Sequence, residues 1–302
     1  MSSSKIVVIG SSNTDMLVTS DKLPEHGETI IGGEFIMNPG GKGANQAVAA
    51  ARLGGNITFI SKVGNDIFGN QAIGNLKNEG IRTEYIIQDP NSPSGVALIM
   101  VNKKGENCIS VAPGANGKLL PEEIEKCKSI IDRSDILLIQ LEIPLKTVER
   151  AIQTARKSNT KIILDPAPAY KLPGEILENV HIITPNESEA QQITGIEVNS
   201  IESARKAATR LKEMGPEIAI VTLGARGAYV KSEALDQLVS TKEVNAMDTT
   251  AAGDTFNGAL AIGISEQMSL LDAIEFANSA ASVTVTKMGA QSSIPYRREL
   301  KS

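Results

Sequence analysis

The sequence predicts an α/β fold in which a Rossmann-like, doubly wound and mostly parallel central sheet is flanked by helices. Short runs rich in Ile, Val and Leu are typical of strands buried on both faces, and they alternate with amphipathic helical patterns. The expected strands span residues 6–9, 136–141, 161–164, 180–184 and 218–223, and clear helical patterns cover residues 145–157 and 201–214. In sheets of this kind ligands bind at the carboxyl ends of the strands.

Two β-rich insertions, approximately residues 14–39 and 94–112, interrupt this alternation. In the second, the turn Lys103–Glu106 separates two strand-like runs, which predicts a β-hairpin. We expect the insertions to form one small sheet that acts as a lid and excludes water from a bound ligand. Two separate hairpins at the sheet edge are the alternative. Because no repeat or Pro-rich linker divides the chain, residues 1–302 are expected to form a single domain.

Composition narrows the possible partners and chemistry. The net charge of -5, without a long Lys/Arg run, argues against a nucleic acid partner. No signal-peptide pattern or membrane-length apolar run occurs, so we expect a cytoplasmic protein that does not bind membranes. Cys108 and Cys127 lack metal or redox spacing and are expected in the core. With His26 expected at the surface and His181 in a strand, a His-based zinc site or catalytic triad is excluded.

A loop of small and polar residues, 248–253, leads into an apolar helical pattern near the C-terminus. The free N–H groups of a helix start, left open by small residues, predict an anion hole for phosphoryl oxygens over residues 251–254. Asp254 would then lie beside a transferring phosphate, where a carboxylate can accept the proton of an attacking hydroxyl. Alternatively, Asp254 only caps the helix.

The second segment, residues 38–46, is rich in glycine and precedes an alanine-rich helix expected over residues 47–52. Its glycines permit close approach of a ligand, and Lys42 and Asn45 present hydrogen-bond donors. The segment is no Walker A motif, because Gly-Lys is not followed by Ser or Thr. The first strand ends without a G-x-G-x-x-G motif, in a turn whose Asn13 and Asp15 can bind hydroxyls.

Two further segments directly follow expected strands. Asn186 and Glu189 could order the waters of a phosphate-bound Mg²⁺, or could simply cap a helix. The turn 222–227 is rich in glycine and could pass closely along a nucleotide, although by itself it predicts only a hairpin.

The combination resembles the ribokinase-like, phosphofructokinase-B type carbohydrate kinases over essentially the whole chain. The two signature regions stand at residues 40–54 and 248–259 and are specific in this order and separation. The resemblance implies a lid that also serves as a homodimer interface, and ATP-dependent phosphorylation of a sugar, expected to be D-ribose at its 5-hydroxyl. Many family members have Gly where this chain has Ala251, but the Ala is common among the ribose-specific members.

The resemblance also assigns residues. It implies that Asp254 is the catalytic base and that Ala252 and Gly253 belong to the anion hole. The sugar-binding positions are Asn13, Asp15, Gly41, Lys42, Asn45, Glu142 and Asp254. The nucleotide positions are Asn186, Thr222, Leu223, Gly224, Ala225, Arg226, Gly227, Ala252, Gly253 and Asn278. Asn186 and Glu189 match the element associated indirectly with Mg²⁺. Potassium activation is implied by a monovalent-cation site matching Asp248, Thr250, Thr284, Lys287, Gly289 and Ser293.

Other functions stay open at this point. A related kinase could act on fructose, 2-deoxyribose, a sugar phosphate or a nucleoside. The absence of Trp disfavours a nucleoside, and the scarcity of cations in the lid disfavours a sugar phosphate. A non-catalytic sugar or nucleotide sensor could keep the fold without turnover. A nicotinamide-dependent oxidoreductase is excluded by the missing dinucleotide motif.

Overall fold

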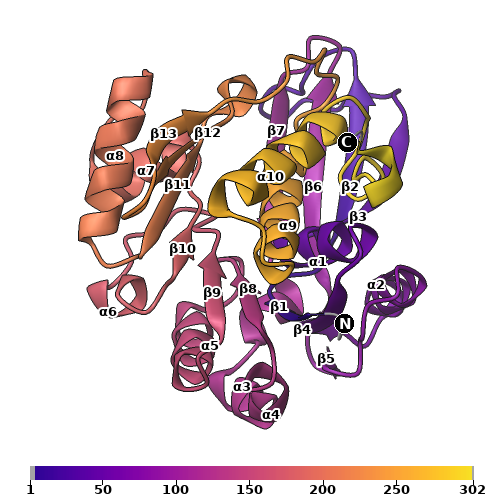
Figure 1. Ribbon diagram of the computed structural model, residues 1–302. Helices are drawn as coiled ribbons and strands as arrows, with labels where there is room; N and C mark the ends of the chain where they lie inside the picture. The colour runs from indigo at the N-terminus through magenta and orange to yellow at the C-terminus, as the bar shows by residue number, and fades with distance from the viewer. Residues whose placement is uncertain (1–3, 301–302) are drawn as a thin grey trace.

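The computed structural model describes residues 4–300 and contains a central nine-stranded sheet in the order β13-β12-β11-β10-β9-β8-β1-β4-β5 (Figure 1). The seven strands from β11 to β5 in this order are parallel to their neighbours. At one edge, β12 is antiparallel to β11, and β13 is antiparallel to β12. The strands are β1 (Lys5–Ile9), β4 (Asn56–Gly64), β5 (Ile86–Asp89), β8 (Ile136–Ile139), β9 (Lys161–Leu164), β10 (Ile182–Ile183), β11 (Ile218–Thr222), β12 (Ala228–Lys231) and β13 (Asp236–Val239).

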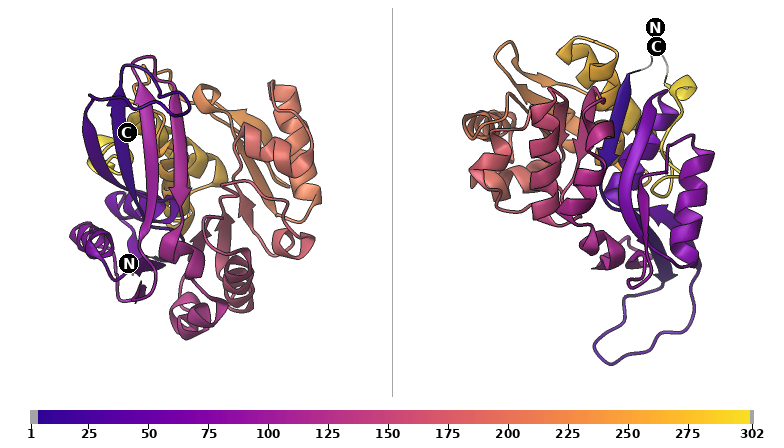
Figure 2. Two further views of the ribbon diagram at one scale, coloured as in Figure 1. Left: turned by 180° about the vertical axis from the view of Figure 1, so that it is seen from behind. Right: turned by 90° about the horizontal axis from the view of Figure 1, so that it is seen from below.

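Helices cover both faces of this sheet (Figures 1 and 2). One face is packed mainly by α1 (Lys42–Arg52), α2 (Ile67–Asn78), α9 (Ala252–Ser265) and α10 (Leu270–Thr284). The other is packed by α3 (Pro121–Lys126), α4 (Lys128–Ile131), α5 (Leu145–Lys157), α6 (Gly174–Leu177), α7 (Glu187–Thr194) and α8 (Ile201–Glu213). Short 3₁₀ turns are η1 (Gly114–Lys118), η2 (Gly224–Arg226) and η3 (Arg297–Glu299).

The helical layers on both faces of the sheet explain why its strands are apolar at successive positions. In β1, Val7 and Ile9 face one core, whereas Ile6 and Val8 face the other. Successive side chains of a strand point to opposite faces, so a strand covered on both sides must be apolar at every position. Each side chain buried in this way contributes roughly 1.5–3 kcal/mol of transfer free energy.

The two insertions form a second sheet of four strands, in the order β3-β2-β6-β7. Its strands are β2 (Asn13–Ser20), β3 (Phe35–Gly40), β6 (Gly95–Asn102) and β7 (Asn107–Ala112). Strand β2 is antiparallel to β3 but parallel to β6, so the insertions share one sheet and are not separate hairpins. This small sheet stands at one side of the molecule, and the connection 21–34 extends from it in the right view of Figure 2.

The predicted elements are found, with differences at their ends. The strand expected over 180–184 is shorter, although the N–H groups of His181 and Thr184 still bond to the neighbouring strand. Helix α1 begins at Lys42, five residues earlier than expected. Cys127 is buried as expected, but the prediction for Cys108 is wrong. Cys108 is exposed, because it lies in the edge strand β7 on the outer face of the small sheet.

Candidate active site

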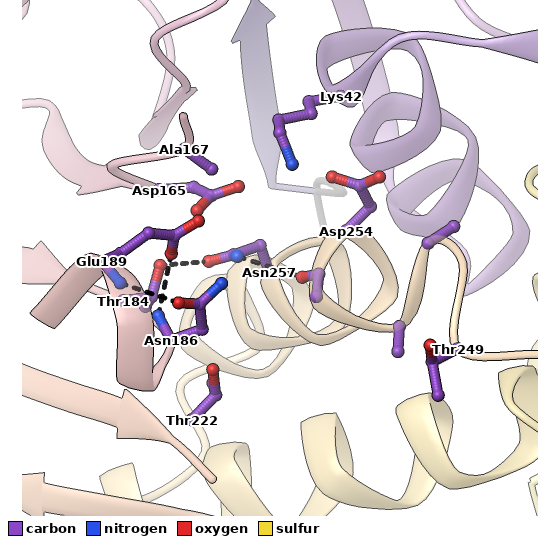
Figure 3. Close-up of a pocket in the computed structure, with 13 residues that line it drawn as sticks. Lys42, Asp165, Ala167, Thr184, Asn186, Glu189, Thr222, Thr249, Asp254 and Asn257 are labelled. Atoms are coloured by element: carbon purple, nitrogen blue, oxygen red, sulfur yellow. Dashed lines mark hydrogen bonds between the residues drawn. The ribbon is translucent and has the colours of Figure 1, made fainter. Parts of the chain in front are cut away.

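The predicted site lies where the parallel strands end. Thr184, Asn186 and Thr222 follow or close β10 and β11, and the start of α9 faces them across a cavity of about 180 Å³. Figure 3 shows Lys42 and Asp254 on one side of this cavity and Glu189 on the other. The full lining is Lys42, Asp165, Ala167, Thr184, Asn186, Glu189, Thr222, Thr249, Ala251, Ala252, Gly253, Asp254 and Asn257.

Asp254 is buried in the first turn of α9, and its carboxylate is held by the neighbouring helix α1. Asn45 Nδ2 donates to Oδ2 at 2.9 Å, and Gln46 Nε2 donates to Oδ1 at 3.1 Å. Helix α9 has Ala251 at its N-cap and no side-chain cap. The interpretation of Asp254 as a helix cap is therefore wrong, and its carboxylate is presented to the cavity instead.

The start of α9 leaves backbone donors free. Ala252 N–H bonds to Thr249 O at 3.3 Å, but within residues 4–300 the N–H groups of Gly253 and Asp254 have no hydrogen-bond partner. Ala251 has a φ of 60°, an unusual conformation for a residue with a side chain, at the turn into the helix. With Gly253 adding no side chain, an anion can approach these N–H groups.

Lys42 is surrounded by carboxylates. Burial alone would lower the pKa of its ammonium, but Asp254, Asp165, Glu142 and Glu189 outweigh it and raise the pKa of Lys42. The ammonium therefore stays charged at neutral pH. One cation among four acidic side chains leaves this part of the site with excess negative charge, which favours a further cation when phosphate binds.

The predicted sugar-binding residues come together beside this cavity. Gly41 is the N-cap of α1, and Lys42 N–H donates to Glu142 Oε2 at 3.1 Å. Asn13 Oδ1 accepts a hydrogen bond from Asn116 Nδ2 at 2.8 Å, which fixes the side chain at the start of β2. The single amide oxygen of Asn45, Oδ1, is buried and has no hydrogen-bond partner among the described residues.

Asp15 lies in an acidic environment. Burial and, after it, the nearby carboxylates Glu142 and Asp254 together raise the pKa of Asp15 to about 6. These interactions place all three acids around one small volume. Their oxygens can accept hydrogen bonds from the hydroxyls of an uncharged sugar.

Asn186 and Glu189 cap α7, which was one of the two alternatives predicted for these residues. Asn186 Oδ1 accepts from Glu189 N–H at 2.9 Å, and Glu189 Oε2 accepts from Asn186 N–H at 2.8 Å. Both residues also line the cavity, so the cap fixes them at its edge. Burial raises the pKa of Glu189, with Asp254 adding to the effect, as expected for a carboxylate in an acidic cluster.

A second cavity, of about 590 Å³, adjoins the first and shares Asn186, Thr222, Thr249, Ala252 and Gly253 with it. Of the other predicted nucleotide residues, Gly224, Ala225, Gly227 and Asn278 line it. Leu223 is buried in the core, and Arg226 pairs with Glu187, so neither is part of the lining. The Asn278 amide is already engaged with Val239 O at 2.9 Å.

Hydrogen bonds join three of the predicted cation residues, Asp248, Thr250 and Gly289. Asp248 accepts hydrogen bonds from Thr250 N–H and Oγ1 and from Gly289 N–H at 2.8 Å. Burial opposes the charge on Asp248, but these donors prevail and lower its pKa. The Thr284 hydroxyl donates to Thr255, directly after Asp254. In contrast, the side chains of Lys287 and Ser293 bond to Glu299 and Ala290 O.

Sequence reasoning missed several residues of the site. Asp165 directly follows β9, and the rule that selected polar residues after buried strands could have found it. Gln46 and Gln140 are fully buried and were not recognised. Asn257, which bonds to Thr184 Oγ1 at 2.7 Å, lies inside a helix whose pattern is otherwise apolar.

Comparison with known proteins agrees with this geometry. A family model described as pfkB family carbohydrate kinase matches residues 3–297. The chain belongs to this family. As a pfkB family carbohydrate kinase, it presents both signature segments at the cavity, one through Lys42 and the other through Asp254. No helix within residues 4–300 has the length and apolar character needed to span a membrane.

Curated and solved relatives are similar over nearly their full length. Ribokinase of Haemophilus influenzae is 44% identical over 294 residues, which cover 97% of this chain and 96% of the relative. Deoxyribokinase of Salmonella typhi is 38% identical over 291 residues, covering 96% and 95%. The solved structure of Arabidopsis thaliana ribokinase complexed with ribose and ATP has a TM-score of 0.91 at 31% identity, with coverage of 99% and 98%.

Proposed function

We propose that this chain transfers the γ-phosphate of ATP to the 5-hydroxyl of D-ribose, with Asp254 as the base. The observation that carries the proposal is the position of the Asp254 carboxylate, between free backbone donors and a cluster of hydroxyl-binding residues. Similarity to ribokinases, one of them solved with ribose and ATP, supports this substrate pair. The 38% identical deoxyribokinase makes 2-deoxyribose the second candidate.

In this mechanism the chain's own groups act on a hydroxyl and a phosphate. Asp254 accepts the hydroxyl proton as the sugar oxygen bonds to phosphorus, and the phosphoanhydride bond to ADP breaks. The N–H groups of Gly253 and Asp254 donate to the phosphoryl oxygens as their charge is redistributed. Lys42 stays protonated beside them. The small sheet, acting as a lid, keeps water from competing with the sugar.

A divalent cation suits the acidic cluster around the cavity. Glu189 and Asn186 lie at its edge and offer oxygen atoms, the ligands that Mg²⁺ prefers. Bound there with ATP, Mg²⁺ would neutralise phosphate charge and polarise the transferring group. We place the nucleotide in the larger cavity, where small residues of the 222–227 turn allow close approach.

We also propose potassium activation through the loop around Asp248. The Asp248 carboxylate accepts hydrogen bonds from the N–H groups of Thr250 and Gly289. The Thr284 hydroxyl donates a hydrogen bond to Thr255 at the start of α9. A monovalent cation held by this loop would stiffen the backbone that carries the phosphate-binding N–H groups. ATP as substrate and free, unbridged cysteines are compatible with a cytoplasmic location.

The small sheet is the proposed homodimer interface. Strand register places Asp15 and Ala97 on one face and Met16 and Leu98 on the other. That outer face exposes apolar side chains on adjacent strands, a surface that a second copy would bury. Its exposed members are Val18, Phe35, Met37, Leu98 and Met100.

Release of ADP from Mg·ATP tests the assignment. The panel contains D-ribose, 2-deoxyribose, fructose, fructose phosphates and adenosine, each with potassium or a large inert cation. We expect potassium-stimulated turnover on ribose, whereas sugar binding without ADP release would favour a sensor. Asp254→Asn should lower kcat by about 10²–10⁴ and retain sugar binding, because a positioned base contributes that much. Near-normal turnover in this variant would reject Asp254 as the base.

A further inference from the structure

We infer that Gln46 is a positioning residue that holds the Asp254 and Asp165 carboxylates together through one amide nitrogen, and that Gln140 fixes the orientation of this amide. The inference rests on the proposed role of Asp254. Gln46 is fully buried in α1, and its Nε2 lies 3.1 Å from Asp254 Oδ1 and 2.7 Å from Asp165 Oδ2. A primary amide nitrogen carries two hydrogens, so it can donate one to each carboxylate.

The direction of the amide follows from what surrounds it. An ionised carboxylate only accepts hydrogen bonds, and a protonated carboxyl keeps an accepting oxygen, so the nitrogen of Gln46 faces both groups and its oxygen faces away. On the far side, Gln140 Nε2 donates to Gln46 Oε1 at 2.6 Å. A rotated Gln46 amide would lose all three bonds and direct its oxygen at two acids. Gln140 therefore selects the orientation that serves Asp254.

Gly10 leaves the space that the Gln140 side chain occupies. Gln140 directly follows β8, next to Gly10, which follows the paired strand β1. A Cβ at Gly10 would lie 2.0 Å from Gln140 Oε1, so only glycine allows the side chain to turn inward. Within residues 4–300 this oxygen has no hydrogen-bond partner. Burial of an unpaired oxygen is unfavourable, which indicates that the Gln140 amide is kept for its donor.

The amide acts on the geometry of Asp254. Asn45 holds one carboxylate oxygen and Gln46 holds the other, so the group cannot rotate about its side-chain bond. Asp165, fully enclosed, has its pKa raised by burial, with Lys42 opposing and Asp254 adding to the rise. Gln46 thus holds Asp254 in one orientation beside a second acid.

The test compares Gln46→Met with Gln140→Met. Both replacements preserve length and remove the amide, and Gln153→Met on the exposed face of α5 is the control. Sugar binding and thermal unfolding establish that each variant folds. For Gln46→Met we expect kcat to fall tenfold or more, with a far smaller change in KM, over about pH 5 to pH 9.

Gln140→Met should lower kcat in the same way by a smaller factor, again with little change in KM, and it tests the inference if Gln46→Met fails to fold. A wild-type kcat in either folded variant, or a loss that falls equally on KM, would overturn the inference. Asp254→Asn, measured alongside, separates the two proposals. If it is inactive while the Gln46 and Gln140 variants keep the wild-type kcat, only the role of Gln46 is rejected; if it is active, the proposed base itself is rejected.

Discussion

Asp15 is predicted to reduce the stability of the unliganded protein at neutral pH. Its pKa rises from 3.8 to about 6 on folding, because burial and then Glu142 and Asp254 disfavour the charged form. A raised folded-state pKa means that the stabilising contribution of this acid is complete below about pH 4 and is lost as pH rises through about 6. About two pH units at 1.36 kcal/mol each give at most about 3 kcal/mol, less solvent screening of a partly exposed group.

Asp15→Asn should remove this penalty. Without sugar at about pH 8, we expect a free energy of unfolding up to about 3 kcal/mol above that of the wild type, and near equality at about pH 4. Urea unfolding at the two pH values measures the difference, with exposed Asp21→Asn as the control. Sugar binding should weaken in Asp15→Asn. The reasoning is refuted if the variant gains nothing at pH 8, or gains equally at both pH values.

Three further predictions concern packing, capping and assembly. Gly258→Ala would place a Cβ 2.6 Å from Ala49 Cβ where α9 meets α1, so we expect a loss of about 1–3 kcal/mol in urea unfolding. Gly74→Ala, in open space on α2, should leave the free energy of unfolding unchanged or raise it. Equal changes in stability for the two glycine variants would contradict this reasoning. Asp66→Ala removes the α2 cap and two bonds to Ser94, at a cost of about 1–2 kcal/mol; unchanged stability would contradict it. Leu98→Asp should yield a monomer in analytical ultracentrifugation, whereas an unchanged dimer would reject the outer face as interface.

Much of the fold was predictable because buried parallel strands need apolar residues on both faces. Runs such as 6–9 and 161–164 therefore appeared directly in the sequence, and the structure confirms β1 and β9 there. The short strand β10 was overestimated, because Val180 and Thr184 are as buried as strand residues although they lie outside it. Cys108 was misplaced because an apolar alternation does not reveal whether a face is covered.

The site was predictable where residues follow strands or form glycine-rich turns, as for Asn13 and Lys42. Gln46 and Gln140 could not be found in this way. Their importance depends on contacts across 94 residues of chain, and a single polar residue within an apolar run gives no sign of its partner. The position of Asp254 was found, but the choice between cap and presented carboxylate required knowing that α1 lies against it.

The contact between α1 and α9 also constrains how the protein is made. Asn45 and Asp254 are separated by 209 residues, so a ribosome adding about 5–20 residues per second leaves about 10–40 seconds between them. During that time the alanine-rich side of α1, including Ala47 and Ala50, has been synthesised without the helix that covers it. The nascent chain thus presents an apolar surface suited to a chaperone until α9 emerges. A chain terminated before α9 would lack Asp254 and would also keep that surface exposed.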